Sequence, residues 1–132
     1  MKGQLVTLLL IASVACDRDQ AVGPLDALYR RWHLIRSRPV QDTNWTVRDT
    51  NYDLEYRADN TIVYRQKEKL LQGNCCAPTG FNREGTEINY TGWVLCYNAL
   101  CGTLKKATIT LLSEQSLELS DGYVVSQYEA VD

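Results

Sequence analysis

The fold is indicated most clearly by residues 52–66, which read YDLEYRADNTIVYRQ. From residue 52 to residue 57, aromatic or aliphatic side chains alternate with charged ones, which is typical of a strand with one buried face. Asp59 and Asn60 follow as turn residues, because both bond their local backbone and tolerate left-handed backbone angles. The chain then returns as a second strand, so this stretch predicts a β-hairpin. Its inward face is expected to hold Tyr52, Leu54 and Tyr56.

The same alternation recurs on both sides of this hairpin. Apart from one helical turn expected near Leu28, no segment keeps a period of 3.6 residues, and Asp121-Gly122 is a strong turn signal. The chain therefore predicts an all-β domain, a small antiparallel barrel or flattened sandwich of about eight strands. Further strands are expected at residues 32–37, 45–47, 105–112, 117–120 and 123–131, with Ala107, Ile109 and Leu111 on one face of residues 105–112.

The composition limits the chain to one domain and excludes some partners. A length of 132 residues with 45% hydrophobic side chains suits a single core. The formal net charge of −2 is spread along the chain, so no basic surface for nucleic acid is expected. We expect no cofactor.

The N-terminal segment has the layout of a secretory signal. Lys2 provides a positive start, an apolar core runs from Leu5 to Val14, and small residues lead to Ala15-Cys16. This apolar core is too short for a permanent membrane-spanning helix. We expect residues 1–15 to be a signal peptide, residues 16–24 a flexible tether and residues 25–132 the β domain.

Residues 13–16, Ser-Val-Ala-Cys, resemble the lipobox of bacterial lipoproteins. The resemblance implies that Cys16 becomes the acylated N-terminus and holds the protein on a membrane of the bacterial cell envelope. Two or three acyl chains make such an anchor almost permanent, since each buried methylene contributes roughly 0.8 kcal/mol. The alternative is an ordinary cleaved signal in which Cys16 is incidental.

The other four cysteines are gathered in residues 75–101. With Cys16 consumed by lipid, they can form two disulfides, and we expect each bridge to join the start of this stretch to its end. Two such pairings exist, and the sequence leaves both open. Zinc sites and thioredoxin-type centres favour Cys-x-x-Cys spacing, which this stretch lacks, so no metal site is expected. The four residues are Cys75, Cys76, Cys96 and Cys101.

Several short motifs resemble small bacterial lipocalin-like lipoproteins. These are Leu28-x-x-x-Trp32-x-Leu34, the hairpin of residues 52–66, and the closing Leu117-x-Leu119 with Tyr123 and Tyr128. The order Cys76, Phe81, Ile88-Asn-Tyr90, Cys96 is also similar to META-type domains. The resemblance implies a lipocalin-like (calycin-type) barrel in an envelope lipoprotein, and it implies no specific ligand.

The candidate ligand-binding residues are aromatic. Such rings can line an apolar cavity that opens at one end of a small barrel, or they can simply fill the core. Both interpretations remain open for Trp32, Tyr52, Tyr56, Tyr64 and Tyr90.

No catalytic residue is expected. His33 is the only histidine and belongs to the outer face of its strand. Asp53, Glu55 and Asp59 offer carboxylates of the kind a hydrolase needs, but alternating charges are typical of a solvated strand face.

The sequence therefore predicts a non-catalytic, membrane-anchored envelope lipoprotein whose β domain is a binding or interaction module. Its expected partners are the membrane, through the N-terminal lipid, and either a small apolar ligand or an envelope protein. One alternative is a structural or assembly protein without a small-molecule cavity. A hydrolase-type enzyme is a further alternative, which would require a cleft that gathers His33 with acidic groups. The oligomeric state is left open.

Overall fold

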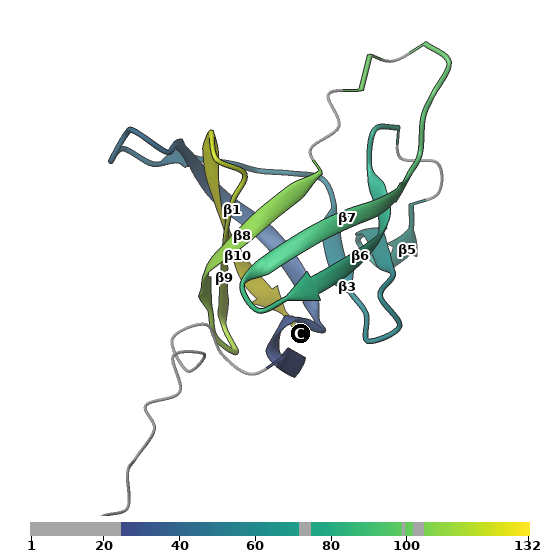
Figure 1. Cartoon of the computed structure of the whole chain (residues 1–132), viewed down its shortest axis with the longest axis horizontal. Helices are drawn as coiled ribbons and strands as arrows, with labels where there is room; N and C mark the ends of the chain where they lie inside the picture. Colours follow the sequence, from purple (N-terminus) through teal and green to yellow (C-terminus); the bar gives the residue numbers. More distant parts are fainter. Residues whose placement is uncertain (1–24, 72–74, 99, 102–104) are drawn as a thin grey trace, which may run out of the picture.

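A computed structural model describes residues 25–71, 75–98, 100–101 and 105–132 (Figure 1). The expected signal peptide, Cys16 and the tether of residues 16–24 lie outside the described residues.

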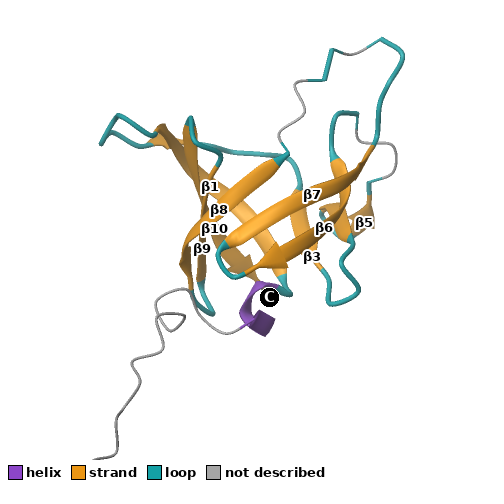
Figure 2. Cartoon of the chain, in the orientation of Figure 1, coloured by secondary structure: helices purple, strands orange, loops and turns teal. Residues whose placement is uncertain are grey.

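The described chain is almost entirely β-structure (Figure 2). It contains one short 3-10 helix and ten strands, all paired antiparallel in one sheet. The elements are η2 (Leu25–Leu28), β1 (Arg31–Pro39), β2 (Thr46–Val47), β3 (Asp53–Tyr56), β4 (Ile62–Gln66), β5 (Lys69–Leu70), β6 (Pro78–Glu84), β7 (Glu87–Trp93), β8 (Lys106–Leu112), β9 (Ser116–Ser120) and β10 (Val124–Val131).

The strands follow one another around a strongly curled sheet in the order β5-β4-β3-β1-β10-β9-β8-β7-β6 (Figure 1). β1 pairs with both β3 and the last strand, β10, while β2 pairs with the far part of β1. The all-β prediction is confirmed, but the count of about eight strands is too low. β2 lies at the short strand expected at residues 45–47, whereas β5 and β6 were not among the expected strands.

The expected closed barrel is not formed by a continuous ladder. Among the described residues, the one β-bridge between the β4 and β6 sides of the sheet is an isolated bridge that joins Thr61 to Gly80. The amide of Phe81 donates to the carbonyl of Asn60 across the same gap, at 3.0 Å. A side chain at Gly80 would bring its Cβ to 3.3 Å from that carbonyl, so glycine permits this close approach. We call this gap the β4–β6 seam.

The helix closes one end of the curled sheet. η2 lies at the lower end in Figure 2, and Leu28 is fully buried. The Trp32 indole nitrogen donates to the Leu28 carbonyl at 3.0 Å, which satisfies the one polar group of a fully buried ring. The core continues through inward-facing residues of β3, β4, β6, β7, β8 and β9, chiefly Tyr56, Ile62, Phe81, Ile88, Ala107, Ile109, Leu112, Leu117 and Leu119.

One strand face was predicted wrongly. Leu111 was expected to share the buried face of Ala107 and Ile109, yet Leu111 is 37% exposed and Leu112 is 4% exposed. The register between β8 and β9 shifts between Ile109 and Leu111, so one extra residue enters β8 there. Such a bulge moves every following side chain to the opposite face of the sheet.

Two disulfides hold the end of the sheet opposite η2. Cys75 is bonded to Cys96 and Cys76 to Cys101, which is one of the two pairings that the sequence left open. The first two cysteines lie in a turn before β6 rather than on a strand, and Cys76 has a positive φ of 64°. The bridges close loops of 21 and 25 residues, for which the chain-entropy account gives on the order of 3 kcal/mol each.

Candidate functional site

A cavity of about 250 Å³ lies inside the sheet, toward the disulfide-linked end. Residues from β3 and β4 form one wall, and the start of β6 with the end of β7 forms the facing wall. The cavity therefore sits beside the β4–β6 seam, where the ladder is missing. Its lining residues are Tyr52, Leu54, Tyr56, Ile62, Tyr64, Cys76, Ala77, Pro78, Tyr90, Trp93 and Tyr128.

Hydrogen bonds and ring contacts position several of these phenols. The hydroxyls of Tyr56 and Tyr90 are bonded to each other at 2.9 Å. The Tyr64 hydroxyl donates to the Pro78 carbonyl at 2.9 Å, and the Tyr64 ring meets the Tyr52 ring edge-on, with centroids 5.9 Å apart. These contacts fix the walls of the cavity before any ligand enters.

The cavity environment favours the neutral form of four of its phenols. Burial is the largest cause that raises the pKa of Tyr56, Tyr64, Tyr90 and Tyr128 above that of a solvated phenol. None of the residues lining this cavity carries a charged side chain. The site therefore offers apolar ring surface together with hydroxyls that can both donate and accept.

Four of the five aromatic residues singled out in the sequence line this cavity, namely Tyr52, Tyr56, Tyr64 and Tyr90. Trp32 does not line it; the residue is fully buried and lines a hollow of about 30 Å³ that shares Tyr52, Leu54 and Tyr128 with the cavity. This side chain is part of the core because the first strand enters the sheet directly above η2.

Sequence reasoning missed two aromatic lining residues, Trp93 and Tyr128. Tyr128 lies on β10 opposite Leu34 of β1. It faces inward, as does Trp32, which precedes Leu34 by two residues on β1. The alternation of the last strand contained that signal. Trp93 ends β7, so its place at the cavity follows only from how β7 meets β6.

A smaller hollow of about 70 Å³ adjoins the main cavity, and both share Tyr90 and Tyr128. This hollow is lined by one charged residue, Asp121, in the turn between β9 and β10. Its other lining residues are Ala107, Leu119, Val124 and Ser126.

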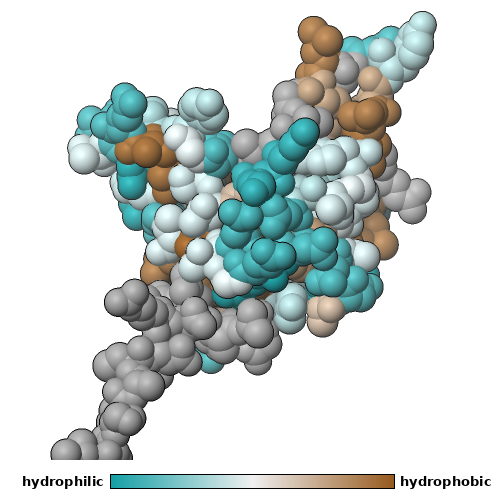
Figure 3. Space-filling view, viewed as in Figure 1, coloured by the Kyte–Doolittle hydropathy of each residue, from teal (hydrophilic) through white to brown (hydrophobic). Residues whose placement is uncertain are grey.

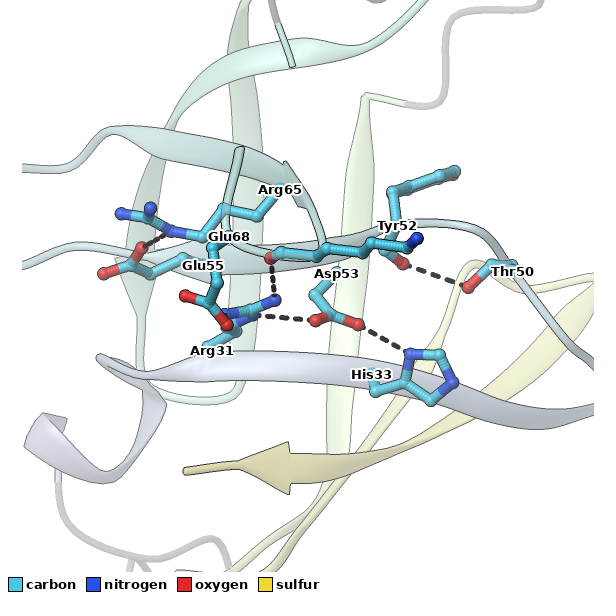
Figure 4. A network of polar contacts seen from close by, with 9 residues as sticks. Arg31, His33, Thr50, Tyr52, Asp53, Glu55, Arg65 and Glu68 are labelled. Carbon is cyan, nitrogen blue, oxygen red and sulfur yellow. Dashed lines mark hydrogen bonds and ion pairs between the residues drawn. The ribbon is translucent and has the colours of Figure 1, made fainter. Parts of the chain in front are cut away.

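A polar network covers the outer face of β1 and β3 (Figure 4). The Asp53 carboxylate bonds His33 Nδ1 at 2.6 Å through one oxygen and Arg31 Nε at 2.7 Å through the other. Glu55 pairs with Arg65 at 2.9 Å. The outward direction predicted for His33, Asp53 and Glu55 agrees with this arrangement, although all three are half-buried and engaged in hydrogen bonds or ion pairs rather than freely solvated.

The carboxylates of this network already have partners. Both carboxylate oxygens of Asp53 accept hydrogen bonds within the network. Asp59 lies in the turn between β3 and β4, where one of its oxygens accepts from the amide and the hydroxyl of Thr61. His33 lines neither the main cavity nor the adjoining hollow. The network therefore ties β1 to β3 and β3 to β4, and it faces away from the cavity.

Exposed apolar side chains gather on the connection between β7 and β8. Leu95 is 71% exposed, and Tyr97 and Leu100 are fully exposed. Figure 3 shows hydrophobic surface on this projecting connection, at the same end of the molecule as the cavity. The disulfides through Cys96 and Cys101 tie it back to the turn before β6.

Two other kinds of site are not found within the described residues. These residues contain no group of three or more His, Cys, Asp or Glu side chains arranged to hold a metal ion. Nor does the described part of the chain form a helix of the length and apolarity needed to span a bilayer.

Comparisons with known proteins add no relative to this description. The chain matches no protein-family model, no curated protein and no solved structure.

Proposed function

We propose that this protein is a small binding module whose ligand is compact, mainly apolar and held among tyrosine side chains. The observation that carries this proposal is the cavity of about 250 Å³ with Tyr52, Tyr56, Tyr64 and Tyr90 in its lining. Ligand pockets in proteins have volumes of roughly 300–1,000 Å³, so this cavity suits a ligand of about one ring system. A lining of apolar groups with a few hydroxyls is typical of such sites.

The shape of the domain supports a lipocalin-like cup as its architecture. Consecutive long strands are neighbours in the sheet, and β1 pairs with β10, so the sheet curls until its ends meet at the seam. The helix and Trp32 fill one end, which leaves the cavity toward the other. One closed end and one end with a cavity make a cup.

Binding can be tested with tert-butylbenzene, a neutral probe of suitable size. We expect the oxidised protein to bind it, with chemical-shift changes in NMR spectra that centre on Tyr64 and Tyr90. Ala77→Phe places a ring in the cavity and should weaken binding at least tenfold. Ala58→Phe makes the same change in an exposed turn and should bind as the parent does.

Circular dichroism of both variants checks that each is folded. The proposal is overturned if the parent protein does not bind the probe, or if the two phenylalanine variants bind it equally well.

We also propose that the module is held in the bacterial cell envelope by lipid on Cys16. Two disulfides suit an oxidising compartment outside the cytosol, and Ser13-Val14-Ala15-Cys16 resembles a lipobox. The described chain starts at η2, at the closed end of the cup. An anchor before it would attach the domain to the membrane from the closed end of the cup.

Intact mass tests this anchor. Protein extracted from membranes and alkylated without reduction should have the mass of residues 16–132 plus acyl groups, with no alkyl label. A mass without lipid, or with labelled cysteines, contradicts the anchored and oxidised form.

A second candidate function is that of a non-catalytic assembly partner. It is favoured by Leu95, Tyr97 and Leu100, which project from a disulfide-tied connection. Under this alternative, Tyr97→Ser with Leu100→Ser abolishes association with an envelope protein and leaves probe binding unchanged.

A further inference from the structure

The main cavity and the smaller hollow beside it form two chemically different halves of one site. Tyr90 and Tyr128 line both, so the two spaces meet at these rings. The larger space has aromatic and aliphatic walls, whereas the smaller one contains the carboxylate of Asp121. Asp121 is the one charged residue among those that line either space.

We propose that the site selects a small organic monocation, with its apolar body among the tyrosines and its ammonium group directed to Asp121. This inference rests on the proposed binding function and names the class of ligand.

The turn between β9 and β10 holds the Asp121 carboxylate in place. Its Oδ1 accepts from the backbone amides of Tyr123 at 2.8 Å and Val124 at 2.7 Å. The other carboxylate oxygen has no hydrogen-bond donor among the described residues, so its negative charge is available to a positive group. Gly122 permits this turn through a φ of 93°. The turn therefore holds the carboxylate in position through one of its two oxygens and leaves the other available.

Aromatic walls favour a cation over a neutral group of the same shape. The faces of Tyr and Trp rings carry negative potential, and cages of such rings recognise quaternary ammonium ligands. Tyr52 meets Tyr64 edge-on at 5.9 Å, and Tyr90 meets Trp93 at 6.3 Å, so the rings stand at steep angles to each other around the cavity. A ligand inside meets ring surface from several sides.

The electrostatic field has the sign that a cation needs. Burial is the main cause that raises the pKa of Tyr90, and the negative charge of Asp121 raises the pKa further. The field that disfavours a phenolate at Tyr90 stabilises a positive group in the same place. An anionic ligand would meet Asp121 without any Lys, Arg or His among the lining residues.

A matched pair of probes isolates the charge. Phenyltrimethylammonium and tert-butylbenzene have nearly the same shape and differ by one positive charge. We expect the cation to bind the oxidised protein about tenfold more tightly in NMR titrations. Benzenesulfonate, an anion of similar size, should not bind.

Asp121→Asn removes the charge and keeps an oxygen that can accept from the two turn amides. In this variant the preference for the cation should fall, because only the aromatic walls still favour it, and the affinity for tert-butylbenzene should not change. Glu84→Gln removes a charge from an exposed position on β6 and should preserve the tenfold preference.

The outcomes separate this inference from the function on which it rests. If tert-butylbenzene binds as tightly as the cation, or if Asp121→Asn keeps the tenfold preference, the inference is overturned and the binding function stands. If neither probe binds, both are overturned.

Discussion

The hydroxyl of Tyr64 donates a 2.9 Å hydrogen bond to the carbonyl oxygen of Pro78 and thereby joins β4 to β6 where the sheet has no ladder. Elsewhere in the seam, backbone contacts are made at the bridge between Thr61 and Gly80 and by the Phe81 amide, which donates to the Asn60 carbonyl. A side chain that lines the cavity thus also holds the two ends of the sheet together. Stability and cavity shape are coupled at this residue.

Tyr64→Phe tests this coupling. The variant removes the seam hydrogen bond and keeps the ring, so we expect the free energy of unfolding to fall by about 0.5–1.5 kcal/mol in urea titrations. Tyr52→Phe is the matched control, because Tyr52 is 42% exposed and its hydroxyl has no hydrogen-bond partner within the described part of the chain. Its stability should stay within about 0.5 kcal/mol of the parent. Equal losses in both variants would show that the Pro78 contact does not stabilise the seam.

Gly80→Ala tests the close approach at the bridge. The new Cβ would lie 2.6 Å from Thr91 Oγ1 and 3.3 Å from the Asn60 carbonyl. We expect the free energy of unfolding to fall by about 1–3 kcal/mol, because the neighbouring atoms must move apart to make room for the methyl group. Adding Thr91→Ala removes the nearer clash and should recover part of the loss, which a double-mutant cycle measures. Strict additivity of the two changes would contradict the contact.

Alkaline titration tests the buried phenols. Burial raises the pKa of Tyr56, Tyr64, Tyr90 and Tyr128 above about 10, the value of a solvated phenol. The folded state therefore keeps these protons to higher pH than the unfolded chain does. Their contribution to stability is complete below pH of about 10 and is lost as the pH rises beyond it, by up to about 1.4 kcal/mol per pH unit for each phenol.

The measurement is urea unfolding at a series of alkaline pH values, with tyrosinate absorbance as a second signal. In Tyr128→Phe, the number of protons released on unfolding at alkaline pH should be smaller by about one, so the unfolding free energy should depend less steeply on pH. A stability that does not change between pH of about 10 and 12 would contradict burial of these groups.

The bulge in β8 predicts opposite results for adjacent leucines. Leu112 is 4% exposed in the core, so Leu112→Ala should cost about 2–5 kcal/mol. Leu111 is 37% exposed, so Leu111→Ala should cost less than about 1 kcal/mol. Urea titrations of both variants measure these losses. A larger loss for Leu111→Ala than for Leu112→Ala would contradict the bulge and support the regular alternation expected from the sequence.

The sequence by itself determined the features that depend on neighbouring residues. Alternation in residues 52–57 and 61–66 predicts β3 and β4, and the turn between them is built by the side chains expected there. Asp121-Gly122 likewise forms the turn before β10. These patterns are local because backbone conformation and side-chain direction repeat every two residues in a strand.

The tertiary structure alone decided how distant strands meet. The β8 bulge depends on the register with β9, which moves Leu111 outward although its own sequence alternates. The seam depends on where β4 reaches β6, and the cavity depends on side chains from β3, β4, β6, β7 and β10 that leave a space unfilled. Whether the tyrosines fill a core or line a cavity is set by packing between residues far apart in the chain, and sequence alternation gives only their direction.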